Sequence, residues 1–323
     1  MSGPADTRWL QATARLALRG RPASTPNPSV GCIIVSNGMV AGRGWTQAGG
    51  RPHAEAMALE QAGAAARGAD VYVSLEPCAH ISRRGPSCTS LLSKARPARV
   101  FIGHTDPDPR TAGRGADALR EAGIDVIEAN CPVSAASLAG YLTRKIFGRP
   151  HVTLKLASSL DGRIALADGT SRWITSEPAR AHVHSRRAMA DAILVGGGTW
   201  RTDRPALDVR LPGLEDRSPR RVVLTSQPVE GAETISTLAD ITTLEAQYLY
   251  VEGGGQAAAA FLAEDLVDRL ELYTAPIVIG ADGAPMLGDL GLTDLVPAHG
   301  RWTLSEQRQL GSDSFVAYDR IRT

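Results

Sequence analysis

Three short segments within residues 52–88 carry side chains that could bind a metal ion. His53, Cys78 and Cys88 supply one imidazole and two thiolates, and nitrogen and sulfur donors of this kind suit tetrahedral Zn²⁺. Three protein ligands leave the fourth position for water, whose pKa bound zinc lowers to about 7. Glu55, two residues after the histidine, can move protons without binding the metal. A His/Cys/Cys zinc site with a non-ligand glutamate indicates a nucleobase deaminase.

The spacing of His53 and Glu55 places both residues at the start of a helix. In mid-helix, side chains two positions apart point about 200° away from each other and could not share a site. Pro52 fits a helix start, because proline is favoured in the first turn. Residues 54–66 are rich in good helix formers. The sequence therefore predicts a helix over 54–66 that presents the imidazole and the carboxylate together.

Each cysteine also has a defined context. Residues 71–75 form an apolar segment typical of a buried strand, which delivers Cys78. Cys88 precedes residues 89–92, a predicted helix start, where the helix dipole favours a thiolate. The alternative is a pair of core cysteines and an unrelated surface histidine. That alternative leaves the glutamate and the strand and helix contexts unexplained.

Length and composition indicate a globular chain of two domains. The chain has 323 residues, and 43% of them are apolar. The net charge is +1 and no long basic run occurs, which gives no electrostatic case for binding nucleic acid. No run of about 18 apolar residues is present, so no membrane-spanning helix is expected. The N-terminus lacks the basic and apolar pattern of a secretory signal.

The four cysteines do not suggest a disulfide framework in a chain of this length. Cys32, in an apolar strand, and Cys131, near a predicted linker, are interpreted as structural thiols. We therefore expect a reducing, cytoplasmic location. We also expect a homo-oligomer, either a dimer or a tetramer.

Two alternations of strands and helices divide the chain into predicted domains at residues 1–146 and 147–323. The first is predicted to contain a helix at 7–19, a hairpin at 30–45 turning at 36–38, the helix at 54–66, a strand at 70–75, a helix after Cys88, a strand at 99–103, a helix at 115–122, a strand at 124–128 and a helix with a connector over 131–150. The second is predicted to contain strands at 151–157, 191–195, 221–225, 248–251, 268–275 and 314–319, helices at 177–189 and 256–263, and an exposed loop at 212–220. This alternation predicts α/β domains with helices covering mixed sheets.

Further motifs surround the metal-binding residues. Residues 26–31 are Pro-Asn-Pro-Ser-Val-Gly, and Glu-Pro-Cys-Ala-His occupies 76–80. With His-Ala-Glu at 53–55, they resemble the cytidine-deaminase-like superfamily, and within it the deaminase half of the bifunctional riboflavin-biosynthesis proteins. The resemblance continues through motifs at residues 155–163, 173–175, 203–207 and 251–254. It implies an N-terminal cytidine-deaminase-like zinc domain and a C-terminal dihydrofolate-reductase-like domain that uses NADPH.

In the first domain, the resemblance implies that Asn27 contacts the pyrimidine and that His80 contacts the substrate or supports the metal ligands. A turn asparagine is the alternative for Asn27. The loop between the zinc cysteines is one residue longer than in most of the family, which leaves open whether Arg83 or Arg84 faces the substrate phosphate. Gly-Trp-Thr-Gln at 44–47 stands where the family often has a histidine.

In the second domain, glycine runs at 196–198 and 253–255 each follow an apolar strand. Glycine lets a backbone approach a ligand closely, although each run could equally be a tight turn. The resemblance implies cofactor contacts from Ala157, Trp173, Thr199, Asp203, Ser226, Gly254 and Gly255. It places the ribose phosphate near Lys155, Ser171, Arg187, Leu207, Arg210 and Glu252. Without it, the arginines would be interpreted as surface charges and Trp173 as a core residue.

The sequence thus predicts a bifunctional enzyme of riboflavin biosynthesis. Its first domain would deaminate 2,5-diamino-6-ribosylamino-4(3H)-pyrimidinone 5′-phosphate with zinc, and its second would reduce the ribosyl group to ribityl with NADPH. One alternative is a zinc deaminase of guanine, cytosine or a tRNA adenosine fused to a binding domain. Another is a non-catalytic scaffold. The segment at 211–248 is short for the family, which leaves the preference for NADPH over NADH open.

Overall fold

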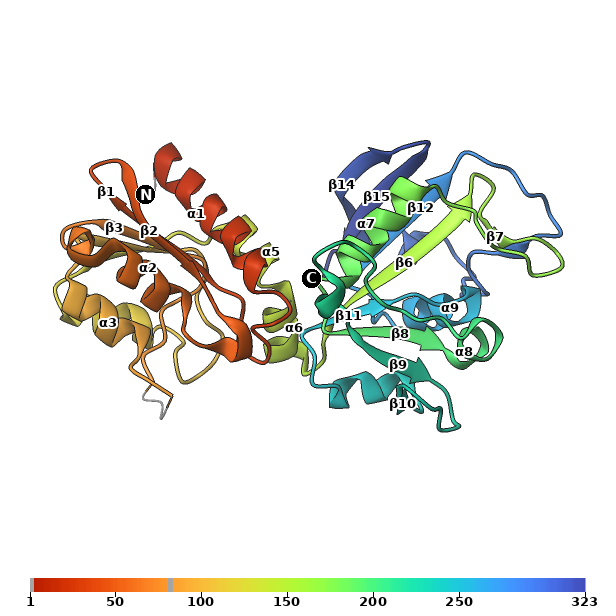
Figure 1. Cartoon of the computed structure of the whole chain (residues 1–323), viewed down its shortest axis with the longest axis horizontal. Helices are drawn as coiled ribbons and strands as arrows, with labels where there is room; N and C mark the ends of the chain where they lie inside the picture. The colour runs from red at the N-terminus through yellow and green to blue at the C-terminus, as the bar shows by residue number, and fades with distance from the viewer. Residues whose placement is uncertain (1–2, 81–83, 323) are drawn as a thin grey trace. The chain divides into compact units, whose positions relative to one another are not determined.

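The computed structural model describes residues 3–80 and 84–322 and divides the chain into two compact units (Figure 1). The units are Met1–Gly148 and Arg149–Thr323. The division lies two residues beyond the boundary expected after residue 146, because the last helix of the first unit, α6 (Ala139–Phe147), continues to Phe147.

The first unit is built on a five-stranded mixed sheet with the order β2-β1-β3-β4-β5. Its strands are β1 (Gly31–Ser36), β2 (Met39–Trp45), β3 (Asp70–Val73), β4 (Arg99–Ile102) and β5 (Asp125–Glu128). Its other α-helices are α1 (Pro4–Ala17), α2 (Ala54–Ala62), α3 (Cys88–Ala95), α4 (Arg114–Glu121) and α5 (Pro132–Ser137). β1 is antiparallel to β2 and β3, whereas β3, β4 and β5 run parallel.

The period of two along β1 separates the cores on the two faces of this sheet. Cys32 and Ile34 pack with the alanines of α2, and Ile33 packs with Leu10 of α1. The approach of α2 depends on a glycine in β2, since a Cβ on Gly44 would lie 2.3 Å from the Ala54 carbonyl oxygen. This close packing fixes the start of α2 over the sheet.

The second unit contains an eight-stranded sheet with the order β10-β9-β8-β11-β6-β12-β15-β14. Its strands are β6 (His151–Ser159), β8 (Ala192–Gly196), β9 (Arg220–Leu224), β10 (Glu233–Ile235), β11 (Tyr248–Val251), β12 (Arg269–Ala275), β14 (Trp302–Leu310) and β15 (Asp313–Arg320), and a separate pair is formed by β7 (Arg163–Ala165) and β13 (Ala284–Pro285). Its helices are α7 (Glu177–Arg187), α8 (Gly197–Asp203) and α9 (Gly255–Ala263). The strands from β10 to β12 in this order are parallel, so their carboxyl ends meet at one edge.

Helices cover both faces of this second sheet. Ala179 and Val183 of α7 pack with Tyr273 and Phe315, and Phe261 of α9 packs in the core on the opposite face. Lys155, Glu252 and Glu271 therefore share the α7 face with an aromatic cluster, because alternate strand residues point to the same side.

The sequence predicted most of the long elements and missed several short or polar ones. The structure adds β7, α8, β10, β13 and β14 to the predictions. β14 is an edge strand whose residues are mostly polar and exposed, so it lacks the apolar alternation that signals a strand. Helix α2 begins at Ala54 as expected, with His53 as its N-cap residue, so Pro52 precedes the helix and does not lie in its first turn.

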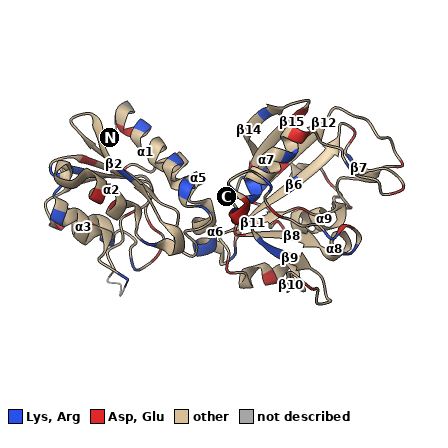
Figure 2. Cartoon of the chain, viewed as in Figure 1, with Lys and Arg blue, Asp and Glu red and all other residues tan. Residues whose placement is uncertain are grey.

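Acidic and basic residues are interspersed along both units (Figure 2). Among the residues that the structure describes, no helix combines the length and the apolar character needed to cross a bilayer.

Candidate zinc and cofactor sites

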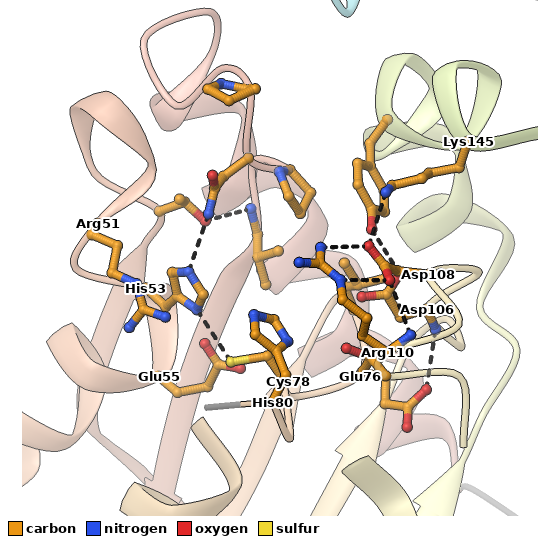
Figure 3. A pocket seen from close by; sticks show the side chains of 18 of the residues that line it. Arg51, His53, Glu55, Glu76, Cys78, His80, Asp106, Asp108, Arg110 and Lys145 are labelled. Atoms are coloured by element: carbon orange, nitrogen blue, oxygen red, sulfur yellow. Dashed lines mark hydrogen bonds and ion pairs between the residues drawn. The ribbon is translucent and has the colours of Figure 1, made fainter. Parts of the chain in front are cut away.

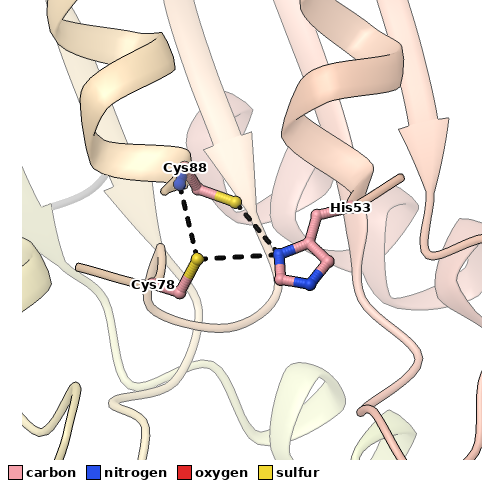
Figure 4. Close-up of side chains that lie close together, drawn as sticks. All are labelled: His53, Cys78 and Cys88. Carbon is pink, nitrogen blue, oxygen red and sulfur yellow. Dashed lines mark hydrogen bonds between the residues drawn. The ribbon is translucent and has the colours of Figure 1, made fainter. Parts of the chain in front are cut away.

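His53, Cys78 and Cys88 come together at one end of the first sheet (Figure 4). Their ligand atoms all lie within 4.8 Å of one another. The Nδ1 atom of His53 is 3.2 Å from Cys88 Sγ and 3.6 Å from Cys78 Sγ. His53 is the N-cap residue of α2, Cys78 lies in the loop after β3, and Cys88 begins α3.

The two thiols share their protonation. The pKa of Cys78 is lowered to about 4, chiefly by hydrogen bonding to the Cys88 thiol and, against the effect of burial, to His53. The pKa of Cys88 is raised by the same hydrogen bond and by burial. The backbone N–H of Cys88 also donates to Cys78 Sγ at 3.4 Å. One thiolate is therefore ready at neutral pH, and this nitrogen and sulfur donor set fits Zn²⁺.

Glu55 lies beside these ligands in the first turn of α2. Its side chain is 3% exposed, yet it lines the pocket that contains His53 and Cys78 (Figure 3). Burial raises the pKa of Glu55 above its ordinary value, an effect that His53 opposes. A carboxyl group with a raised pKa is suited to accept and return a proton near neutral pH.

This pocket has a volume of about 240 Å³ and also contains Asn27 and His80. Asn27 Nδ2 lies 3.3 Å from His53 Nε2, on the side of the ring away from the sulfurs, and donates to the Gly50 carbonyl oxygen at 3.3 Å. His80 Nδ1 is buried without a hydrogen-bond partner among the described residues. A buried polar atom without a partner calls for one, and a ligand in the pocket could supply it. Arg84 lines the same pocket, and Arg83 lies outside the described residues.

The sequence reasoning missed a second wall of this pocket. Asp106 and Asp108 come from the segment after β4, and Tyr141 and Lys145 come from α6. The Tyr141 hydroxyl donates to Asp106 Oδ1 at 2.8 Å, and Lys145 Nζ donates to Asp108 Oδ2 at 2.8 Å. Asp-Pro-Asp-Pro at 106–109 is a compact acidic motif that could have drawn attention, whereas nothing in the sequence marks Tyr141 or Lys145.

A charged cluster in the second unit brings together Lys155, Arg187 and Glu252. Arg187 Nε and Nη2 donate to the two Glu252 oxygens at 2.6 and 3.0 Å, and Lys155 Nζ lies 3.8 Å from Glu252 Oε2. Burial alone would raise the pKa of Glu252, but Lys155 and Arg187 lower it below its ordinary value. Burial lowers the pKa of Lys155. The interpretation of Arg187 as a plain surface charge is therefore wrong.

Other residues expected near the ribose phosphate are placed differently. Arg210 is exposed and pairs with Asp208 at 3.0 Å, while the Asp208 carbonyl accepts from Arg187 at 2.9 Å. Leu207 is buried in the core beneath α7, so its side chain faces away from solvent. Ser171 is exposed.

The two glycine runs lie at the carboxyl ends of neighbouring parallel strands, β8 and β11. A Cβ on Gly198 would meet no atom within 4 Å, and one on Gly254 would meet only Thr199 Oγ1, at 3.7 Å. Gly254 is the N-cap residue of α9, and no side-chain cap forms at this helix start among the described residues. Gly255, in contrast, packs against backbone, since a Cβ there would lie 2.9 Å from the Pro285 carbonyl oxygen. The space beside Gly198 and Gly254, at the start of a helix, fits the phosphates of a dinucleotide.

Four of the remaining expected cofactor contacts belong to elements at this edge of the sheet. Thr199 and Asp203 belong to α8, Ser226 follows β9, and Ala157 lies on β6. Trp173 is 66% exposed, so its interpretation as a core residue is wrong. Its ring lies 4.6 Å from the Arg180 guanidinium.

The fold and these sites define a zinc deaminase unit followed by an α/β reductase unit. Residues 4–104 match the cytidine and deoxycytidylate deaminase zinc-binding region, and residues 150–316 match the RibD C-terminal domain. The riboflavin biosynthesis protein RibD of Escherichia coli is 38% identical, over 95% of this chain and 97% of its own length. The RibD of Mycobacterium tuberculosis H37Rv is 38% identical, over 90% of this chain and 91% of its own length.

Solved structures agree with this comparison. A structure of Acinetobacter baumannii RibD has a TM-score of 0.87 and 34% identity, covering 98% of this chain and 99% of its own. A Thermotoga maritima protein, described as a diaminohydroxyphosphoribosylaminopyrimidine deaminase/5-amino-6-(5-phosphoribosylamino)uracil reductase, has a TM-score of 0.85 and 28% identity over the same shares. The chain belongs to the RibD family. It is a bifunctional deaminase and reductase of riboflavin biosynthesis, with zinc and NADPH as its cofactors.

Proposed function

We propose that His53, Cys78 and Cys88 hold the zinc ion and that Glu55 is the proton-transferring residue of the deaminase. The approach of the three ligand atoms to within 4.8 Å of one another, beside a buried carboxyl group, carries this proposal. When bound, zinc polarises a water molecule and supplies the nucleophile at neutral pH. The substrate is a 2,5-diamino-6-ribosylamino-4(3H)-pyrimidinone 5′-phosphate.

Glu55 moves the protons of this hydrolysis. The carboxylate accepts a proton from the attacking water and gives it to the ring nitrogen next to the carbon under attack. A second transfer then assists departure of the amino group as ammonia, so one water is consumed for each ammonia released. The proposed contacts to the pyrimidine are Asn27 and His80. Asn27 Nδ2 lies next to His53 Nε2, and His80 Nδ1 has no hydrogen-bond partner among the described residues.

We propose that the second unit binds the ribosyl chain at Lys155, Arg187 and Glu252. When bound, NADPH supplies the hydride. Lys155 provides a positive charge beside the sugar, and Glu252 accepts hydrogen bonds from hydroxyl groups. Arg187 presents a planar guanidinium that fixes Glu252. Ser171, Arg210 and the backbone of Leu207 are proposed to complete the substrate contacts. The cofactor is proposed to lie along Ala157, Trp173, Thr199, Asp203, Ser226, Gly254 and Gly255.

The decisive experiment is Glu55→Gln, which preserves size but cannot carry the proton. The variant should retain zinc and lose deamination by two or more orders of magnitude. It should still oxidise NADPH when given the deaminated substrate. Glu60→Gln, an exposed position on the same helix, should behave like the parent. Product masses with and without NADPH separate the two activities, and near-normal deamination by Glu55→Gln would refute the role of Glu55.

We further propose a cytoplasmic location and a homodimeric or homotetrameric assembly. A reducing compartment would keep the ligand thiols Cys78 and Cys88 available for metal. Light scattering of the purified protein would measure the assembly, and cell fractionation would test the location.

A further inference from the structure

Two arginines connect the segments on either side of the zinc ligands in the first unit. Arg51 precedes His53, and its Nη1 donates to the Pro86 carbonyl oxygen in the cysteine loop at 3.2 Å. Arg84 lies in that loop, and its Nη2 donates back to the Gly49 carbonyl oxygen at 2.7 Å. Both side chains line the deaminase pocket. They bring two guanidinium groups to the same rim.

The hydrogen bonds that hold this rim leave the charge of Arg51 in place. Among the described residues, Arg51 donates to a carbonyl and has no carboxylate within ion-pair distance. A guanidinium group has five N–H donors in a planar fork that matches a phosphate. Most of the donors of Arg51 therefore remain for a ligand, and its position is fixed in advance by Pro86.

The opposite wall of the pocket is electrostatically different. Asp108 accepts from Arg110 Nη2 at 2.7 Å and from Lys145 Nζ at 2.8 Å, so both cations on this wall already have a carboxylate partner. Asp106 and Glu76 add further acidic groups to it. Figure 3 shows Arg51 on the side of His53, across the pocket from Asp108 and Lys145. An anion entering the pocket is favoured on the side of Arg51.

We propose that Arg51 is a further phosphate-binding residue of the deaminase pocket: it joins the cysteine-loop arginine, at 83 or 84, that the family resemblance places near the 5′-phosphate, and it favours the ribotide over the riboside. This inference rests on the proposed deamination of a pyrimidine ribotide. It adds Arg51 as a specificity-determining residue and orients the substrate with its phosphate at the rim and its base toward Glu55.

The test measures the ribotide and its dephosphorylated riboside as substrates of Arg51→Gln. Rates are expressed per bound zinc, so that zinc lost through a disturbed loop is not counted as lost substrate binding. The KM for the ribotide should rise roughly tenfold to a hundredfold, the loss expected for a charge-assisted contact. The KM for the riboside should stay at the parent value. The ribotide KM of Arg51→Lys should lie between those of the parent and Arg51→Gln, because lysine keeps the positive charge but lacks the planar guanidinium group. Arg67→Gln, an exposed arginine outside the pocket, is the matched control and should change neither KM.

Inorganic phosphate gives a second measurement. It should compete with the ribotide in the parent and compete less well in Arg51→Gln. An unchanged ribotide KM in Arg51→Gln, or an equal rise for riboside and ribotide, would overturn the proposal. So would a selective rise in Arg110→Gln instead, which would place the phosphate on the opposite wall. A parent enzyme that is inactive on the ribotide would contradict the proposed function itself, which separates the two failures.

Discussion

The protonation of the Cys78 and Cys88 thiols is a property of the pair and not of either residue alone. Cys78 is held toward the thiolate, and Cys88 toward the thiol, because they share a hydrogen bond beside His53. Binding of a divalent cation displaces the shared proton into solution. Because a proton is released on binding, metal affinity should increase with pH. The donor types and their spacing were sufficient to predict from the sequence that His53, Cys78 and Cys88 come together.

Removing either thiol should empty the site. Cys78→Ser and Cys88→Ser should each lose most of the zinc and the deamination, because two remaining ligands cannot close a tetrahedral site. Cys131→Ser is the control: this buried cysteine is the N-cap residue of α5, a position that serine favours, and it should keep the parent content of about one zinc per chain. Metal analysis by mass spectrometry measures the outcome. Full zinc content in Cys78→Ser or Cys88→Ser would exclude that residue as a ligand.

Lys155 offers a prediction for the reductase. Burial lowers its pKa and Glu252 partly restores it, so its positive charge is lost as pH rises through a value below the ordinary one. If the charged amine assists reduction, kcat should fall on the alkaline side. Glu252→Gln removes the restoring charge, and the alkaline limb of the kcat profile should move to lower pH. An unmoved limb in this variant would show that Lys155 does not control the step, whatever happens to KM.

At the scale of secondary structure, the sequence predicted elements with strong periodicity and missed connections made by single side chains over long distances. The strands around Cys32 and Leu194 were predicted because their apolar runs are dense. Glu76 shows what could not be predicted: it lies two residues before the proposed zinc ligand Cys78, yet its carboxylate accepts hydrogen bonds from the start of a helix about forty residues away. Oε1 accepts from Gly115 and Ala116, and Oε2 accepts from Gly113 and Asp106, at 2.8–3.2 Å.

Glu76 should therefore stabilise α4 and the second wall of the deaminase pocket. Glu76→Gln places an amide N–H₂ against backbone N–H donors and removes the charge. Hydrogen bonds to a charged group contribute about 1.5–3 kcal/mol each, so local stability should fall by roughly 2–4 kcal/mol. Hydrogen exchange at residues 113–121 measures the effect directly, with Glu121→Gln, an exposed position on α4, as the control. Unchanged protection of α4 in Glu76→Gln would contradict this role.

At the scale of the whole molecule, the sequence predicted two α/β domains because each half has its own alternation of strands and helices. The proposed cofactor edge was harder to predict, because Gly198 and Gly254 come near each other only when β8 and β11 become neighbours. The second wall of the pocket was hard to predict for the same reason, because Lys145 and Asp108 are 37 positions apart in the sequence and meet only in the folded chain. Local pattern identifies elements, whereas tertiary pairing determines which polar residues meet.

Each unit has its own core, so we predict that a fragment of residues 149–323 folds and binds NADPH alone. The first residue of this fragment, Arg149, should contribute to its stability. Arg149 Nη1 and Nη2 donate to Asp268 at 2.6 and 2.9 Å, and both side chains are buried. Arg322 Nε also donates to Asp268 Oδ1, at 3.0 Å, so Arg149→Met removes one of two arginine partners and should cost about 1.5–3 kcal/mol of unfolding free energy in this fragment. Arg221→Met, at an exposed position, is the control.

The pH dependence of this loss follows from Asp268. Burial alone would raise the pKa of this carboxyl, but Arg149 and neighbouring groups lower it below its ordinary value. The stability that the pair contributes is therefore complete above the unfolded pKa of about 3.9 and is lost as pH falls through the lowered folded value. Urea unfolding of the fragment at pH 7 should separate the parent from Arg149→Met, and the difference should shrink toward pH 3. A fragment that is unfolded by circular dichroism at pH 7 would contradict domain independence, and equal stability of the two fragments would contradict the role of Arg149.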